Sequence, residues 1–193
     1  MNRREAVSRV ALILGGTVVG AGAFLEGCKP ATDKKADAAS DGSFSADDIT
    51  YLDEIAETII PTTNTPGAKA AKVGAFMTVM VNDCYDENDQ KIFKEGMKQL
   101  NEASQKKFSK SFVEADANQR KELLTAIDNE AKEYTKSKNE KDPKHYFRMM
   151  KELTLLGYFT SEIGATQALR YIAVPGKFDG SLPYKKGDRA WAT

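Results

Sequence analysis

Apolar residues recur along most of this chain at the three- and four-residue spacing of one helix face, and this period restricts the fold to packed helices. Residues 45–60 show it clearly, with Ser45 placed to cap a helix, Asp48 three residues later, and Pro61 at the end. The apolar stripe of this segment consists of Ile49, Leu52, Ala56, Ile59 and Ile60. Residues 45–60 are therefore predicted to form an amphipathic helix.

The same period continues through the middle of the chain. Residues 73–85 and 86–108 each carry an apolar stripe, and a further helix is expected to start near Asp116. Asp142 followed by Pro143 predicts another helix start, because aspartate is a favoured N-cap and proline is favoured at the first helical position.

The last predicted helix has Thr160 or Ser161 as its cap and would end at Val174-Pro175-Gly176. No run of alternating, β-branched segments separated by tight turns indicates a sheet. We therefore predict an all-α fold, a single helical domain of about five or six helices with an irregular C-terminal tail, preceded by a signal segment and a flexible spacer.

Arg3 and Arg4 stand shortly before an uncharged run, Val10–Leu25, which is sixteen residues long and rich in glycine and alanine. This layout is typical of a signal peptide, and the run is short for a membrane-spanning helix, which needs about 20 apolar residues. The adjacent arginines favour a twin-arginine export signal, although Ala6 and Val7 replace the bulky apolar pair usual in such signals. A plain secretory signal or a weak transmembrane helix is the alternative.

Cys28 is a candidate site of lipid attachment. Leu25, Gly27 and Cys28 resemble the lipobox of bacterial lipoprotein precursors, whereas Glu26 departs from its small or apolar residue. A free cysteine in an uncleaved anchor or linker is the alternative. Residues 29–44 are small, polar and charged, and are predicted to be a flexible spacer because they cannot bury enough apolar area to fold. The predicted boundaries are 1–28 for the signal segment, 29–44 for the spacer and 45–193 for the helical domain.

The balance of charges argues against one class of partner. The chain has 28 lysine and arginine residues against 28 aspartate and glutamate residues, and from residue 29 onward the balance is 25 against 26. Proteins that bind nucleic acids usually carry a basic balance or a basic face. We therefore expect no nucleic acid among the partners of this chain.

Few residues are suited to catalysis or to metal binding. His145 is the only histidine, which rules out a site with several histidines, and we expect it to be exposed or to cap the helix after Pro143. Cys84 continues the apolar stripe of residues 73–85 and is expected on the core face. Dinucleotide-binding, phosphate-loop and haem-attachment motifs are absent from the sequence. We predict no catalytic, cofactor-binding or metal-binding residue in this chain.

The most specific segment of the sequence is "LTLLGYFTSEIGATQALRYIAVPGKFDG", which begins at Leu153. Together with Arg3-Arg4, "IIPTTNTPGAKAAKVGAFM" and "FKEGMKQLNEASQKKF", it resembles the gluconate 2-dehydrogenase subunit 3 family. Members of this family are the small subunits of membrane-bound, flavin-dependent sugar and polyol dehydrogenases.

The resemblance implies a non-catalytic accessory subunit rather than an enzyme. The catalyst would be a separate large flavoprotein of the glucose-methanol-choline oxidoreductase type, which carries FAD and selects the substrate. A cytochrome subunit, whose cofactor would be haem c, often passes the electrons on. The resemblance also implies that the twin-arginine signal of the small subunit exports the complex, which would be periplasmic and membrane-associated.

The C-terminal part of the chain is the candidate partner interface. The helix that includes Leu153 is apolar nearly all round, which predicts burial on more than one side, and the tail after it has no periodicity. The expected interface residues are the aromatic side chains Tyr158, Phe159, Tyr171, Phe178 and Tyr184. A helix in the core of a monomer, covered by its own tail, is the alternative.

Two other functions stay open on the sequence alone. One is a free-standing helical envelope lipoprotein that binds another partner or ligand. The other is an enzyme that would use Cys84, His145 and a carboxylate, although no spacing in the sequence supports that combination.

Overall fold

The computed structural model describes residues 44–139, 142–174 and 176–192. The sequence-based predictions for Arg3, Arg4 and Cys28 lie outside the described residues. Within the predicted spacer, the last residue, Phe44, is described, and the residues before it are not.

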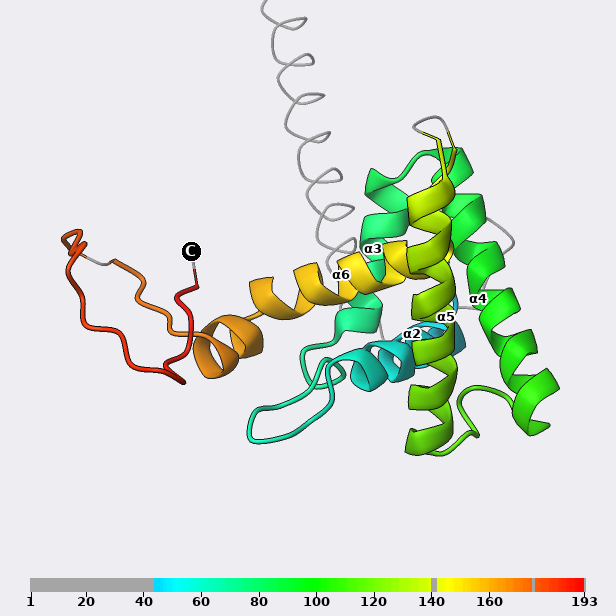
Figure 1. Ribbon diagram of the computed structural model, residues 1–193, viewed down its shortest axis with the longest axis horizontal. Coiled ribbons are helices and arrows are strands. Elements are labelled where there is room, and N and C mark those ends of the chain that lie inside the picture. The colour runs from blue at the N-terminus through cyan, green and yellow to red at the C-terminus, as the bar shows by residue number, and fades with distance from the viewer. Residues whose placement is uncertain (1–43, 140–141, 175, 193) are drawn as a thin grey trace, which may run out of the picture. The chain divides into compact units, whose positions relative to one another are not determined.

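The described residues form five α-helices and a short π-helical turn (Figure 1). They are α2 (Ala46–Ile59), α3 (Val73–Cys84), α4 (Glu87–Phe108), α5 (Ala117–Ser137), α6 (Tyr146–Thr160) and the π-helical turn η1 (Gly164–Ala168). The β-structure found in this part of the chain is an isolated bridge between Arg170 and Trp191. The predicted all-α fold is confirmed. None of the helices in the described ranges is long and apolar enough to cross a membrane.

Side-chain caps set the starts of two helices where the sequence predicted them. The Ser45 hydroxyl accepts a hydrogen bond from the Asp48 N–H at 3.2 Å, and the Asp48 carboxylate accepts one from the Ser45 N–H at 2.8 Å. Asp116 and Gln119 form the equivalent capping box at α5. Such boxes satisfy backbone N–H groups that would otherwise lack partners in the first helical turn.

Helix α6 is the centre of the hydrophobic core and packs against α2, α3, α4 and α5 (Figure 1). Phe147, Met150 and Leu153 on this helix are buried. Gly157 permits the contact with α3, since a Cβ atom at that position would lie 2.5 Å from the ring of Phe76. The core therefore depends on a close helix approach that a larger residue would block.

Phe44 belongs to the helical domain rather than to the predicted spacer. Its ring packs edge-on against Phe93, with the ring centroids 6.1 Å apart, and it is half-buried against the core. The folded part of the chain thus begins at least one residue earlier than predicted.

The predicted helix start at Asp142 and Pro143 is wrong. Helix α6 begins at Tyr146, and His145 is its N-cap, with its Nδ1 atom accepting a hydrogen bond from the Phe147 N–H at 3.2 Å. The Asp142 carboxylate instead accepts hydrogen bonds from Asn139, at 2.7 Å from its backbone N–H, and so is turned back toward the preceding segment. His145 was expected to be exposed or to cap this helix, and the capping role is confirmed.

Cys84 does not lie on the core face of α3, contrary to the prediction. It is exposed at the last residue of the helix, where its Sγ atom lies 3.9 Å from the Sδ atom of Met80. The buried stripe of α3 ends with Val81, one turn earlier.

Candidate functional site

Helix α6 has one face in the core and another face open to solvent. Leu153, Thr154 and Gly157 are buried, whereas Leu156 and Phe159 keep 46% and 41% of their surface exposed. The predicted burial on more than one side is confirmed by the packing of this helix against α2, α3, α4 and α5, but one of its faces stays open to solvent. An exposed apolar face on a helix whose other side is fully packed is a feature of interaction surfaces.

Tyr158 lies on the buried side of α6 and is only 2% exposed. Its hydroxyl group donates a hydrogen bond to the carbonyl oxygen of Pro66 at 2.7 Å, which ties α6 to the loop between α2 and α3. The sequence placed Tyr158 among the interface residues, but the structure places it in the core, where its ring meets that of the partly exposed Phe159 edge-on, with the centroids 5.2 Å apart. Its helical neighbours could not reveal this, because the contact that buries it comes from a loop more than ninety residues earlier.

A sharp turn follows α6 at Ser161. The Ser161 hydroxyl donates to the carbonyl oxygen of Tyr158 at 2.6 Å and accepts from the Gly164 N–H at 3.0 Å. Gly164 is required there, since a Cβ atom at this position would lie 1.8 Å from the Tyr158 carbonyl oxygen. The predicted capping role of Ser161 is confirmed, but the helical segment that follows ends at Ala168 instead of continuing to residue 174.

The tail is closed at its base by Arg170 and Trp191. The Arg170 N–H donates to the Ala190 carbonyl oxygen at 2.8 Å, and the Ala192 N–H donates to the Arg170 carbonyl oxygen at 2.8 Å. The Arg170 guanidinium also lies over the Trp191 ring, 4.5 Å from its centroid. These contacts end the predicted helix early, because the Arg170 backbone pairs with the end of the tail instead of with the preceding turn.

Apolar side chains concentrate in this C-terminal part of the molecule. Of the twelve large hydrophobic residues that are exposed in the described ranges, ten lie on α6 and the tail. They are Leu155, Leu156, Phe159, Tyr171, Ile172, Val174, Phe178, Leu182, Tyr184 and Trp191, and they are called the C-terminal apolar surface below. Phe178 is 96% exposed and Tyr184 is 74% exposed. Four of the five predicted interface residues belong to this surface, and Tyr158 does not.

The tail that carries most of this surface is also basic. Residues 169–192 include five lysine or arginine residues and two aspartate residues, whereas the chain as a whole is balanced. The arrangement of apolar side chains among positive charges suits a partner surface that is apolar at its centre and acidic at its edge.

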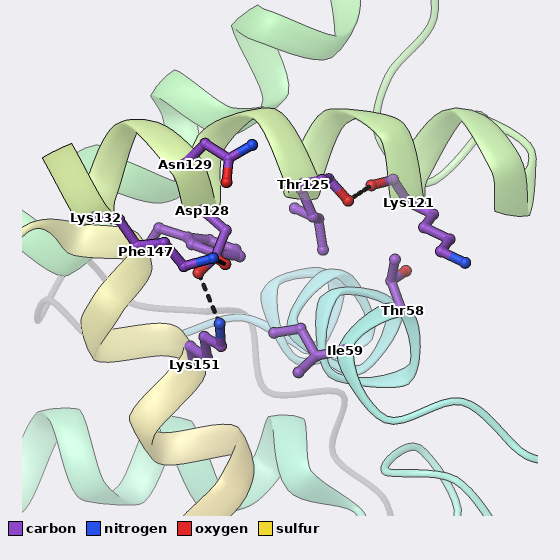
Figure 2. A pocket seen from close by; sticks show the side chains of 10 residues that line it. Thr58, Ile59, Lys121, Thr125, Asp128, Asn129, Lys132, Phe147 and Lys151 are labelled. Carbon is purple, nitrogen blue, oxygen red and sulfur yellow. Dashed lines mark hydrogen bonds and ion pairs between the residues drawn. The ribbon is translucent and has the colours of Figure 1, made fainter.

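A separate concave site lies between α2, α5 and α6 (Figure 2). It has a volume of about 250 Å³, and we refer to it as the α5 cleft. Ile59, Leu124 and Phe147 form its apolar lining, and the lysines at its rim are Lys121, Lys132 and Lys151.

Asp128 is the acidic residue of the α5 cleft, and it is paired with two of the lysines. Lys132 and Lys151 each place their Nζ atom 2.7 Å from one of its carboxylate oxygens (Figure 2). Burial by itself raises the pKa of Asp128, but the hydrogen bonds from the two lysines outweigh burial and hold the pKa below its ordinary value. The carboxylate therefore stays ionised at neutral pH.

Sequence reasoning did not identify the α5 cleft. Lys121, Thr125, Asp128 and Lys132 follow one another at spacings of four, three and four residues, which places them on one face of α5. This spacing was the available signal. It indicates a polar helix face, but only the packing of α2 and α6 turns that face into a concave site.

Cys84 and His145 have separate surroundings. Cys84 contacts Met80 within α3, while the His145 ring packs against Tyr134 and Tyr146, with centroids 5.7 and 4.6 Å away. Burial lowers the pKa of His145, partly opposed by the negative charge of Glu130. The described residues contain no group of three or more histidine, cysteine, aspartate or glutamate side chains that could hold a metal ion.

Comparison with known proteins places most of the helical domain in one family. A family model described as gluconate 2-dehydrogenase subunit 3 matches residues 46–176, which is more than half of the chain. The matched range begins with α2 and continues through α6, η1 and the first part of the tail. No curated protein and no solved structure matches the chain.

Proposed function

We propose that this chain, which belongs to the gluconate 2-dehydrogenase subunit 3 family, is the non-catalytic accessory subunit of an exported FAD-dependent sugar or polyol dehydrogenase. In this proposal the large flavoprotein subunit, of the glucose-methanol-choline oxidoreductase type, carries FAD and performs the oxidation. A cytochrome subunit with haem c would accept the electrons. The accessory subunit provides a docking surface, the export signal and a membrane tether.

The observation that carries the docking role is the C-terminal apolar surface. Soluble monomers rarely expose many large apolar side chains together, and such surfaces mark interaction sites. Phe178 and Tyr184 on the tail are largely uncovered by the rest of the chain. A partner that buries these two side chains removes their apolar surface from water, and this burial favours association.

The helical domain supports this role because contacts at both ends of the tail attach it to the helices. Ser161 and Gly164 fix the turn after α6, and Arg170 and Trp191 hold the two ends of the tail together. A tail held at both ends has less conformational entropy to lose when it binds than a free one.

Export and anchoring are supported by the sequence of the first 28 residues. Arg3 and Arg4 precede the uncharged run, and Cys28 follows it within a lipobox-like segment. Twin-arginine export moves folded proteins, so a flavoprotein that takes up FAD in the cytoplasm would need such an escort. Lipid on Cys28 would then hold the complex at the membrane on its periplasmic side.

The docking role can be tested with a tagged full-length chain purified from its native cells. We expect dye-linked sugar dehydrogenase activity and FAD to co-purify with the tagged chain. Changing Phe178 and Tyr184 together to serine should remove both, because these two side chains are exposed and contribute no core contact. The matched control is Val79→Ser, which alters an exposed apolar residue on α3 and should leave the co-purified activity unchanged.

The outcome of this experiment separates docking from folding. The circular dichroism spectrum of the double variant should equal that of the unchanged protein, since the substituted side chains lie outside the core. If the unchanged chain brings down no FAD or dehydrogenase activity, the free-standing lipoprotein becomes the better hypothesis.

The export role is tested by changing Arg3 and Arg4 to lysine. The charge is retained, but the planar guanidinium groups that the export receptor is expected to read are lost. Dehydrogenase activity should then remain in the cytoplasmic fraction together with this chain. Activity that still reaches the envelope at its normal level would show that this chain is not the escort.

A further inference from the structure

The α5 cleft combines an excess of positive charge with an apolar lining. Three lysines stand at its rim against the single carboxylate of Asp128, so the site carries a net charge of +2. Lys132 and Lys151 share that carboxylate, which neutralises only one of the two. Lys121 also lines the cleft, but it lies at the opposite end of the site from Asp128, Lys132 and Lys151 (Figure 2). Charges of one sign in a concave site with low-dielectric walls attract ions of the other sign.

We propose that the α5 cleft binds a small organic carboxylate, with its charged group beside Lys132 and Lys151 and its apolar body against Ile59, Leu124 and Phe147. This site is distinct from the C-terminal apolar surface and does not depend on the docking role.

The lining determines what the body of the ligand must be. Leu124 and Phe147 are buried residues whose apolar atoms form the floor of the cleft, and Ile59 is half-buried beside them. An apolar ligand surface bound there is removed from water, and no core residue becomes exposed. Ligand sites for drug-sized molecules occupy roughly 300–1,000 Å³. At about 250 Å³ the cleft suits a smaller molecule.

The lysines of the lining, and not its threonines, provide the donors that a carboxylate needs. The hydroxyl groups of Thr58 and Thr125 donate to backbone carbonyl oxygens of their own helices, each at 2.7 Å. Their protons are therefore already used, and these hydroxyls offer a ligand acceptors rather than donors. The lysine ammonium groups are the donors at this site that are suited to a carboxylate.

The direct test is calorimetric titration of the purified full-length chain with sodium benzoate, with benzamide as a neutral molecule of similar shape. Benzoate should bind at least about tenfold more tightly, because benzamide lacks the charge that the lysines recognise. Sodium phosphate is the third titrant and should bind more weakly than benzoate, since it cannot use the apolar floor. This comparison on the unchanged protein requires no variant to fold.

Two variants change the charge of the cleft in opposite directions. Lys132→Gln should weaken benzoate binding about tenfold, the loss expected for one charge-assisted hydrogen bond. Asp128→Asn should tighten binding, because it removes the competing carboxylate and leaves Lys132 and Lys151 for the ligand. A variant that merely disturbed the fold would not bind more tightly. The matched control is Lys136→Gln, which removes the same charge from α5 outside the cleft.

The proposal is overturned if benzoate does not bind, or if benzoate and benzamide bind equally. It is also overturned if Lys136→Gln weakens binding as much as Lys132→Gln, which would indicate attraction to the overall charge of the chain. Phosphate binding as tight as that of benzoate would show an inorganic-anion site and would remove the role given to the apolar floor.

Discussion

Replacing Tyr158 by phenylalanine tests whether this residue stabilises the domain or contacts a partner. The change removes one hydroxyl group and leaves the ring in place, so the lost interaction is the 2.7 Å hydrogen bond to the carbonyl oxygen of Pro66. A hydrogen bond contributes about 0.5–1.5 kcal/mol to stability, and more when the remaining partner is left buried without water. Pro66 is half-buried, and we expect a loss of about 1 kcal/mol in the free energy of unfolding.

The loss should appear as a lower midpoint in thermal unfolding of the full-length chain, followed by circular dichroism. For a domain of this size, 1 kcal/mol corresponds to a decrease of about 2–4 °C in Tm. The matched control is Tyr171→Phe, the same chemical change at a tyrosine that is 55% exposed, and it should leave the Tm unchanged.

The two possible roles of Tyr158 predict opposite results. If Tyr158→Phe leaves the Tm unchanged but reduces the dehydrogenase activity that co-purifies with the chain, the residue acts at the interface. That result would refute the reasoning from its burial and its hydrogen bond to the loop.

Three further predictions concern stability. Glu54→Gln should destabilise the domain by about 1–3 kcal/mol in urea unfolding at pH 7, because it leaves the largely buried Arg120 without its carboxylate. In the unchanged protein, burial by itself raises the pKa of Glu54, but Lys69 and Arg120 outweigh burial and hold the pKa below its ordinary value of 4.5. The contribution of the Glu54 carboxylate to the free energy of unfolding should therefore be complete above pH 4.5 and disappear as the pH falls through the folded-state pKa. Gly164→Ala should lower the Tm, because the added methyl group meets the carbonyl oxygen of Tyr158, and an unchanged Tm would contradict that geometry. Burial lowers the pKa of His145, so the contribution of its neutral ring to the free energy of unfolding should be complete above pH 6.5 and be lost as the pH falls through the lower folded-state pKa. His145→Asn should retain the cap and make the free energy of unfolding less dependent on pH in that range.

The positions of several helices could be read from the sequence because their causes are local. The capping box of Ser45 and Asp48 and that of Asp116 both use residues within one helical turn, and both occur in the structure. Pro61 likewise follows the end of α2 closely. Interactions between residues three or four positions apart can be recognised from the sequence alone.

Predictions failed where two local signals competed or where a distant segment intervened. Asp142 had the residue type of an N-cap, but its carboxylate bonds to Asn139, and His145 caps α6 in its place. Cys84 continued the apolar stripe of α3, but it is exposed at the last residue of the helix. A helical period identifies which residues share a face, but it does not say how far the covering surface extends.

The candidate sites show the same division between local and distant causes. The sequence by itself determined that the chain is helical, where most of its helices begin, and that the C-terminal segment is unusually apolar and aromatic. Only the tertiary structure decided that Tyr158 is buried by the loop at Pro66 while Phe159 stays exposed, and that Arg170 meets Trp191 to close the tail. The reason is physical: secondary structure follows from neighbours along the chain, whereas burial depends on which residues, tens of positions away, arrive at the same place.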